Sequence, residues 1–325
     1  MSVMASRPAT MRQATADAER GVAPAAEPPA LTLWESISFS ITHAVTSAVL
    51  AVCSLRGLYA FGQVFGTLEW LINYRRRRRF HAVLARVLGR SPGRAERRRR
   101  TREFFARSRC DKLLYLVFDR VPREVAQGLL TIENQRLLDE ALARGHGAHL
   151  AMSHHGSPHI FALLMATRGY KTAAVRDQRE GALRRFVQAR LDKRRPELGR
   201  TRWLFADGYP REIYRCLQNG YLVGSGMDVS RVRRPQQRVE DVTIFGERRR
   251  FLSGPIRIAM RCHAPVLQAF VMPLPGFRYR LDVVEMLVDP DRITDERDEI
   301  ARAMRAYAAH VERAVRATPS LITRV

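Results

Sequence analysis

Gly147-Ala148-His149-Leu150-Ala151-Met152 runs directly into Ser153-His154-His155-Gly156-Ser157-Pro158-His159, and this stretch decides the fold. Its first half is mostly apolar and has the length of a strand, and the apolar run at 160–165 that follows is typical of a helix. A strand that turns through small residues into a helix leaves side chains at its carboxyl end, which is where open α/β sheets bind their ligands. We therefore expect the histidines of this corner to line a functional site.

Strand and helix patterns alternate on both sides of the corner. We predict strands at 129–133, 148–152, 171–175, 202–206 and 221–227, and helices at 134–144, 160–165, 180–195 and 210–218. Tandem β-α units predict an α/β fold with a mostly parallel or mixed central sheet flanked by helices. The last third adds a strand at 241–245, a helix from Ser253-Gly254-Pro255 to Cys262, an antiparallel pair at 265–272 and 279–285, and an amphipathic helix at 295–316.

The charge of the chain restricts its partners. Lys and Arg number 56 against 32 Asp and Glu, which gives a formal net charge of +24. Such a balance favours an anionic partner: nucleic acid, an anionic membrane surface, or an acidic carrier or phosphorylated substrate. The sequence shows no recognisable nucleic-acid-binding motif, so we expect no nucleic acid. The four cysteines are far apart, which favours a reduced, cytoplasm-facing protein, and no pattern indicates an oligomeric state.

Composition divides the chain into three parts. We predict a disordered tail at 1–30, a membrane anchor with a basic flank at 31–80, and one catalytic domain at 81–325. Residues 37–55 carry no formal charge, and nineteen helical residues at ~1.5 Å each nearly cross a hydrocarbon core of ~30 Å. Serine, threonine and histidine interrupt this run, so three alternatives stay open: a transmembrane helix or shallow hairpin, an anchor that lies in the interface, or a buried helix. The arginines at 75–79 and Trp34, Trp70 and Tyr74 favour the membrane.

The histidines of the corner allow three hypotheses. His154 could act as a general base, because imidazole with a pKa near ~6.5 takes and returns a proton at neutral pH. His155 and His159 share a helical face at i, i+4 and could bind a metal with His154, but no carboxylate stands nearby at ligand spacing. The third hypothesis is a structural role in ordinary hydrogen bonds.

Residues 145–160 resemble the active-site block of the lipid A late acyltransferases, the lauroyl/myristoyl family within the lysophospholipid acyltransferase superfamily. That block reads as a glycine-rich turn, an apolar strand and then H-F-G-N-W-E-L. His154 falls on the catalytic histidine and Gly156 on the glycine, whereas His159 stands where the family has its acid. The resemblance covers about residues 35–315 and continues at 175–178, 224–228, 243–246, 253–255 and 264–266. It implies a glycerolipid acyltransferase-like fold.

The resemblance implies a function in lipid A and lipopolysaccharide biosynthesis at the cytoplasmic face of the inner membrane. A fatty acyl group would move from acyl carrier protein or acyl-CoA to an anionic lipid or glycolipid hydroxyl or amine, with no metal and no cofactor beyond this co-substrate. His154 would be the general base. His159 would assist it as a hydrogen-bonded partner or, if protonated, as a stabiliser of the oxyanion. Because the acid at 159 is missing, a catalytically silent protein that binds acyl chains or an acyl carrier is the alternative.

Further candidate site residues lie at the ends of predicted strands and in the segments that resemble the family. Arg176 could hold a phosphate or polarise the thioester carbonyl, or could equally be a surface arginine. Asp228 could orient His154 through its ring N–H and so replace the missing carboxylate, or could simply begin a loop. We expect substrate contacts at His155, Gly156, Ser157, Arg190 and Gly254. An acyl carrier or the phosphates of coenzyme A would suit the surplus arginines, which are Arg184, Arg185, Arg190, Arg194, Arg231, Arg233 and Arg234.

Overall fold

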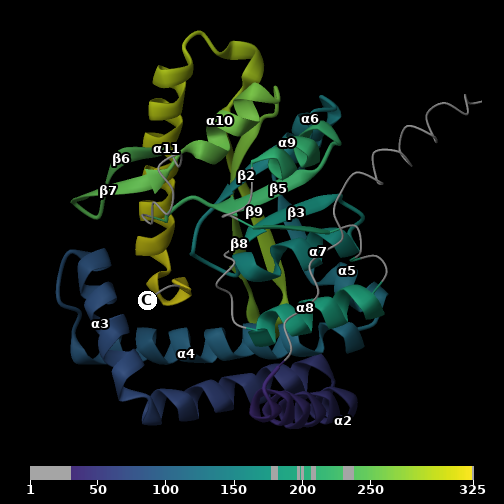
Figure 1. The fold of residues 1–325 in the computed structure, drawn as a ribbon. Helices are drawn as coiled ribbons and strands as arrows, with labels where there is room; N and C mark the ends of the chain where they lie inside the picture. Colours follow the sequence, from purple (N-terminus) through teal and green to yellow (C-terminus); the bar gives the residue numbers. More distant parts are fainter. Residues whose placement is uncertain are drawn as a thin grey trace, which may run out of the picture.

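The computed structural model describes residues 31–176, 182–195, 198, 201–205, 210–229 and 238–323. Its centre is a seven-stranded sheet with the order β1-β9-β8-β2-β5-β3-β4 (Figure 1). Strands β8, β2, β5, β3 and β4 are parallel, while β9 is antiparallel to β8 and parallel to β1, which confirms the α/β prediction. The strand bounds are β1 (Leu130–Glu133), β2 (Ala148–Met152), β3 (Thr172–Arg176), β4 (Arg202–Phe205), β5 (Leu222–Gly226), β8 (Val266–Pro273) and β9 (Tyr279–Val288).

Helices cover both faces of this sheet. Strand β2 is buried along its whole length, and its alternate side chains enter two hydrophobic clusters. Leu150 packs into the cluster that contains side chains of α5, α6 and α7, whereas Ala151 packs into the cluster beneath α9, α10 and α11. This period of two is what a central strand of a layered α/β sheet requires. The helix bounds are α5 (Arg123–Gly128), α6 (Gln135–Ala143), α7 (Phe161–Thr167), α8 (Ala182–Arg194), α9 (Arg211–Gln218), α10 (Gly254–Arg261) and α11 (Glu296–Ala317).

A two-stranded hairpin packs beside α11 (Figure 1). It consists of β6 (Val239–Ile244) and β7 (Glu247–Leu252), which pair antiparallel. The sequence predicted β6 but missed β7. Strand β7 begins with four charged residues, and only Phe251 on it is buried, so its hydrophobic pattern is weak.

Three helices form a layer on one side of the molecule: α2 (Leu33–Ile72), α3 (Tyr74–Leu88) and α4 (Arg94–Val117). In Figure 1, α4 lies between α2 and the sheet. Helix α2 bends at Ser54, whose φ of 59° is not helical. Its second half approaches α4 at backbone distance, because a Cβ on Gly66 would stand 2.4 Å from Ala106 Cα. Residue 80, where the sequence predicted a domain boundary, lies within α3. Leu58 of α2 belongs to the same buried cluster as side chains of β2.

The outer face of α2 is apolar and exposed. It is the one helix among the described residues that is long and apolar enough to cross a membrane, and only 17% of its most apolar window is buried. This low burial contradicts the third alternative, a buried helix. The exposed apolar side chains on α2 are Leu33, Trp34, Ile37, Ile41, Val45, Val52, Val64, Phe65, Leu68, Leu71 and Ile72.

Candidate active site

The corner after β2 is held rigidly against β8. Gly156 has φ of +81°, and a Cβ there would stand 2.2 Å from the Val271 carbonyl oxygen, so only glycine fits. The Gly156 N–H donates to the Leu321 carbonyl at 2.9 Å, and the Ser157 N–H donates to that of Val271 at 2.8 Å. The chain then forms the short 3-10 helix Pro158–Ile160 and enters α7. The predicted strand, corner and helix are confirmed.

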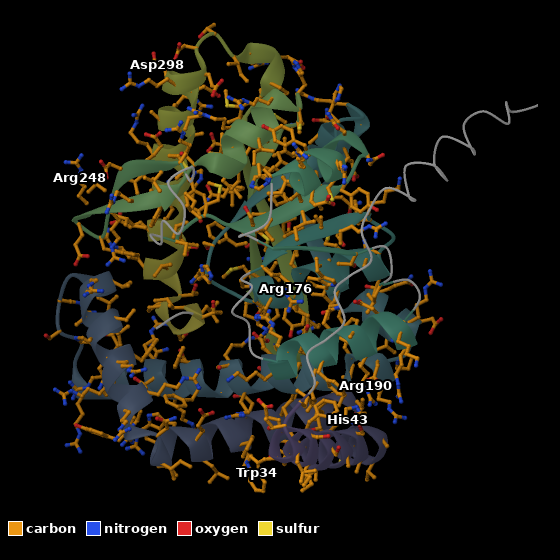
Figure 2. The ribbon with its side chains drawn as sticks, viewed as in Figure 1. Trp34, His43, Arg176, Arg190, Arg248 and Asp298 are labelled. Carbon is orange, nitrogen blue, oxygen red and sulfur yellow. The ribbon has the colours of Figure 1, made fainter. Side chains whose placement is uncertain are left out.

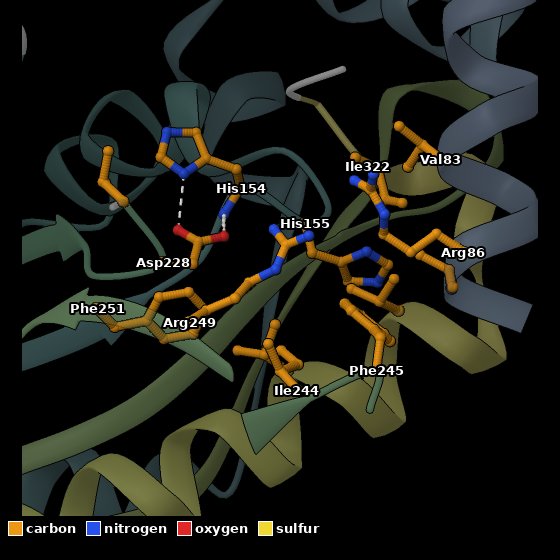
Figure 3. A pocket seen from close by; sticks show the side chains of 14 residues that line it. Val83, Arg86, His154, His155, Asp228, Ile244, Phe245, Arg249, Phe251 and Ile322 are labelled. Atoms are coloured by element: carbon orange, nitrogen blue, oxygen red, sulfur yellow. Dashed lines mark hydrogen bonds and ion pairs between the residues drawn. The ribbon is translucent and has the colours of Figure 1, made fainter. Parts of the chain in front are cut away.

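His154 and Asp228 meet at the carboxyl edge of the sheet. Strands β2 and β5 are parallel neighbours, so the residues that follow them lie side by side. His154 Nδ1 is 2.7 Å from Asp228 Oδ1, and the His154 backbone N–H donates to Oδ2 at 2.8 Å (Figure 3). Because a carboxylate only accepts, the proton of the neutral ring resides on Nδ1, and the Nε2 lone pair is the basic one.

The space around the His154 ring restricts its orientation. Its side chain is 34% exposed, whereas that of Asp228 is 15% exposed. A Cβ at Gly226, the last residue of β5, would stand 3.0 Å from His154 Cε1. The ring therefore has a carboxylate along its edge and the backbone of β5 against it. Both contacts favour a single orientation for a proton-transferring imidazole.

A C-terminal strap, residues 318–323, fastens the corner from the other side. The Thr323 N–H and hydroxyl both donate to the His154 carbonyl oxygen, at 2.8 and 3.0 Å. The Tyr307 hydroxyl of α11 donates to the carbonyl of Met152 at 2.7 Å. Sequence reasoning missed these residues because 169 positions separate Thr323 from His154 and no local pattern links them.

His155 points away from His154, into the strap. Its Nε2 lies 3.0 Å from the Thr318 hydroxyl, which itself donates to the Ala314 carbonyl, so His155 is the donor. Burial lowers the pKa of His155 to about 4, so the ring is neutral at pH 7. His155 thus has a structural contact, and its predicted contact with substrate stays a prediction.

An apolar cavity of about 320 Å³ opens beside the histidine pair. Figure 3 shows Ile244, Phe245 and Phe251 of the hairpin on its wall, with the arginines Arg86 and Arg249 nearby. Besides His154, His155, Asp228 and Val229, the wall comes from α3, the hairpin, α11 and the strap, none of which the sequence assigned to the site. The lining residues are Val83, Arg86, Val87, His154, His155, Asp228, Val229, Ile244, Phe245, Arg249, Phe251, Val311, Val315 and Ile322.

His159 joins a different cluster, on the side of the corner that faces α4. It faces Asp111, whose Oδ2 lies 3.9 Å from His159 Nε2. Burial lowers the pKa of His159 to about 4, and Arg184, Arg107 and Lys112 act in the same direction against Asp111. A lowered pKa favours the neutral ring at pH 7, so it does not support a protonated His159 that stabilises an oxyanion. The assisting role of His159 stays a prediction.

Asp111 of α4 is the centre of this cluster. Its Oδ1 lies 2.7 Å from Arg107 Nη2 and accepts from the Tyr279 hydroxyl at 3.0 Å. Its Oδ2 accepts from the Ser157 hydroxyl at 2.6 Å. Ser157 thus has a structural partner rather than a place on the cavity wall, and its predicted substrate contact stays a prediction.

Two predicted arginines lie outside the cavity lining. Arg176 ends β3, two strands from β2, and its guanidinium carbon stands 4.3 Å from the centre of the Trp203 ring. Arg190 of α8 bonds Asp119 at 3.3 Å and His43 of α2 at 3.2 Å, and Figure 2 shows it beside His43. These contacts tie α8 to α2, so substrate binding by Arg190 stays a prediction.

The remaining predicted residues are placed as follows. Gly254 begins α10, directly after β7, and is not part of the cavity lining. Arg231, Arg233 and Arg234 lie outside the described residues, as does the predicted tail at 1–30. The three corner histidines have three different partners, and the described part of the chain holds no cluster of three His, Cys, Asp or Glu side chains suited to a metal.

The α/β sheet carries a histidine–aspartate pair at its carboxyl edge, beside an apolar cavity, and this arrangement is suited to general base catalysis. The chain belongs to the bacterial lipid A biosynthesis acyltransferase family, whose model matches residues 36–321. It is therefore an acyltransferase of lipid A and lipopolysaccharide biosynthesis. No curated protein matches the chain significantly.

Proposed function

We propose that the protein transfers a fatty acyl group from a thioester to a hydroxyl or amine of a lipid A-type acceptor, with His154 as the general base. The observation that carries this proposal is the 2.7 Å contact between His154 Nδ1 and Asp228 beside an apolar cavity. The family has its carboxylate at the position of His159. Here Asp228 supplies a carboxylate from β5, so the missing acid need not mean a silent protein.

In the proposed reaction, the acceptor hydroxyl attacks the thioester carbonyl while His154 Nε2 takes its proton. Asp228 keeps the ring in the required tautomer and stabilises the imidazolium that forms. The tetrahedral intermediate then collapses, the carbon–sulfur bond breaks, and the imidazolium returns the proton to the departing thiolate. The acyl group ends on the acceptor oxygen and the donor leaves as a free thiol, so no oxidant or covalent acyl-enzyme is needed.

The apolar cavity supports a fatty acyl chain as its occupant. Its wall is formed mainly by valine, isoleucine and phenylalanine side chains, and His154 stands on it. Each methylene removed from water contributes about 0.8 kcal/mol, which is how such a wall would hold an alkyl chain without polar contacts. Arg86 and Arg249 could hold the anionic part of the donor, whether acyl carrier protein or coenzyme A.

The α2 helix supports attachment to the cytoplasmic face of the inner membrane. We propose that it lies in the interface rather than across it. Its inner face carries His43 and Thr46, which are buried, and Phe39 packs edge-on against Phe186 of α8, while its outer face is apolar. The arginines at 75–79 come shortly after α2 in the chain, and an anionic membrane surface would attract them. Extraction at alkaline pH tests this, because an interfacial anchor is released and a spanning helix stays in the pellet.

Release of free thiol tests the acyl transfer. Detergent-purified protein is given acyl carrier or acyl-CoA donors with a membrane lipid extract, and wild type is compared with His154→Ala. We expect turnover in wild type and a loss on the order of 10⁴-fold in His154→Ala, because the general base is removed. His159→Ala, five residues away in the same corner, is the matched control. Equal turnover by wild type and His154→Ala would overturn His154 as the general base. No turnover by either folded protein would overturn the acyl transfer and favour the alternative, a catalytically silent protein that binds acyl chains.

A further inference from the structure

A second cavity, of about 360 Å³, lies beside the strap and is rich in arginine. Its lining residues are Asn73, Arg75, Arg76, Arg79, Phe104 and Thr323. Thr323 also holds the His154 carbonyl oxygen with two hydrogen bonds, and its neighbour Ile322 lines the apolar cavity. Adjacent residues of the strap, Ile322 and Thr323, therefore line the two cavities, and Thr323 connects the second cavity to the corner that contains His154.

The arginines of this cavity differ in how they are held. Arg76 bonds Glu69 and the Ser108 hydroxyl, both at 2.8 Å, and its guanidinium lies 4.8 Å from the centre of the Phe104 ring. Arg75 and Arg79 are exposed, and neither has an ion pair or hydrogen bond through its side chain within the described part of the chain. A fixed arginine with two uncompensated arginines beside it is a suitable arrangement for a multivalent anion.

The local sequence makes these charges costly without an anion. Arg75 and Arg79 are four apart on α3, where like charges repel. The first turn of α3 contains no acidic residue, although the positive end of the helix dipole lies there. An anion between the arginines would relieve both effects. The guanidinium fork fits phosphate in particular, because it donates two parallel hydrogen bonds to it.

The position of the cavity indicates where the phosphate comes from. It begins at Asn73, directly after the apolar end of α2, where Leu71 is 54% and Ile72 is 82% exposed. If this end of α2 meets the bilayer surface, the arginines stand at the level of the lipid headgroups. We propose that this cavity binds the phosphate ester of a lipid, and that Arg75 and Arg79 select a phosphate-bearing acceptor for the reaction at His154. The selection of an acceptor rests on the proposed function, whereas phosphate binding does not.

Binding of dihexanoyl phosphatidic acid, which is soluble, tests the site directly. We expect Arg75→Gln and Arg79→Gln each to raise its Kd about tenfold, because each removes a charge-assisted contact to phosphate. Arg78→Gln is the matched control: it removes the same charge from the next residue of the same helix, but Arg78 does not line the cavity. We expect its Kd to stay within twofold of wild type. Equal losses in Arg78→Gln and Arg79→Gln would overturn the site in favour of a general basic surface.

Two further experiments distinguish a lipid phosphate from free phosphate as the ligand of this cavity. Inorganic phosphate should compete only weakly with dihexanoyl phosphatidic acid, and competition at equal concentration would overturn the assignment to a lipid. With phosphorylated and dephosphorylated forms of the acceptor, Arg79→Gln should raise KM for the phosphorylated form alone and leave kcat unchanged. His154→Ala should retain full binding of dihexanoyl phosphatidic acid, so the phosphate site and the acyl transfer can fail independently.

Discussion

The two sides of the corner carry two histidine–aspartate pairs that differ in almost every respect. His154 contacts Asp228 at 2.7 Å beside an open cavity, and its side chain is 34% exposed. His159 lies 3.9 Å from Asp111, in a cluster with buried Arg107 and Tyr279. The first pair has the geometry for moving a proton, and the second joins α4 to the sheet. The two histidines are exposed to a similar extent, 34% and 25%, so the distance to the carboxylate and the neighbouring cavity distinguish the pairs.

The largest expected effect on turnover in this comparison comes from a substitution of Asp228. Asp228→Asn keeps the size of the side chain but loses the negative charge and one of its two accepted hydrogen bonds. We expect turnover to fall roughly 10²- to 10³-fold, because the imidazolium is no longer stabilised and the ring can take the wrong tautomer. The acidic limb of the pH–rate profile should also move to lower pH. An unchanged rate in initial-velocity measurements would show that Asp228 only begins a loop, the alternative that its sequence position allows.

Asp111→Asn should affect stability instead. The side chains of Asp111 and Arg107 are only 4% and 11% exposed, so removal of one charge leaves the other buried without compensation. We expect a loss of about 3 kcal/mol in the free energy of unfolding, measured by urea denaturation. Asp241→Asn is the matched control, because its pair with Arg248 is exposed, and should cost less than about 1 kcal/mol. A large loss of kcat with intact stability would instead give Asp111 a catalytic part.

Acid should lower the free energy of unfolding through the histidines whose pKa values are lowered by burial. Burial lowers the pKa of His149, His155 and His159 to about 4, whereas unfolded histidine titrates near ~6.5. The unfolded state therefore binds more protons between these values, so stability is full above about pH 6.5 and falls as the pH drops toward 4. We expect each histidine to contribute about 1 kcal/mol per pH unit across this window. Unfolding curves between pH 7 and 4 check this, and a flat profile would show that these rings are already protonated or accessible.

Much of the fold could be predicted, because local patterns determine it. The apolar run of β2, the glycine of the corner and the alternation of the later segments each reflect burial or backbone geometry over a few residues. The site was only half predictable. His154 and Asp228 follow adjacent parallel strands, so topology brings them together. Thr323, Asp111 and the cavity wall are brought to the site by contacts between distant segments. No periodicity in the sequence encodes such contacts.

The smallest expected effect comes from His159 itself. His159→Gln retains a polar side chain of similar length. We expect activity within about threefold of wild type, since the lowered pKa favours a neutral ring and the ring faces Asp111 rather than His154. His159→Glu restores the acid that the family carries at this position, and it is the more informative variant. A carboxylate there would face Asp111, with Arg107, Arg184 and Lys112 to offset the repulsion. If Asp228 already orients His154, the new acid has no role to fill, and thiol release should not rise. A tenfold or larger gain in thiol release would mean that Asp228 is a poor substitute for the acid at position 159. The wild-type protein would then be a less active enzyme than its fold allows.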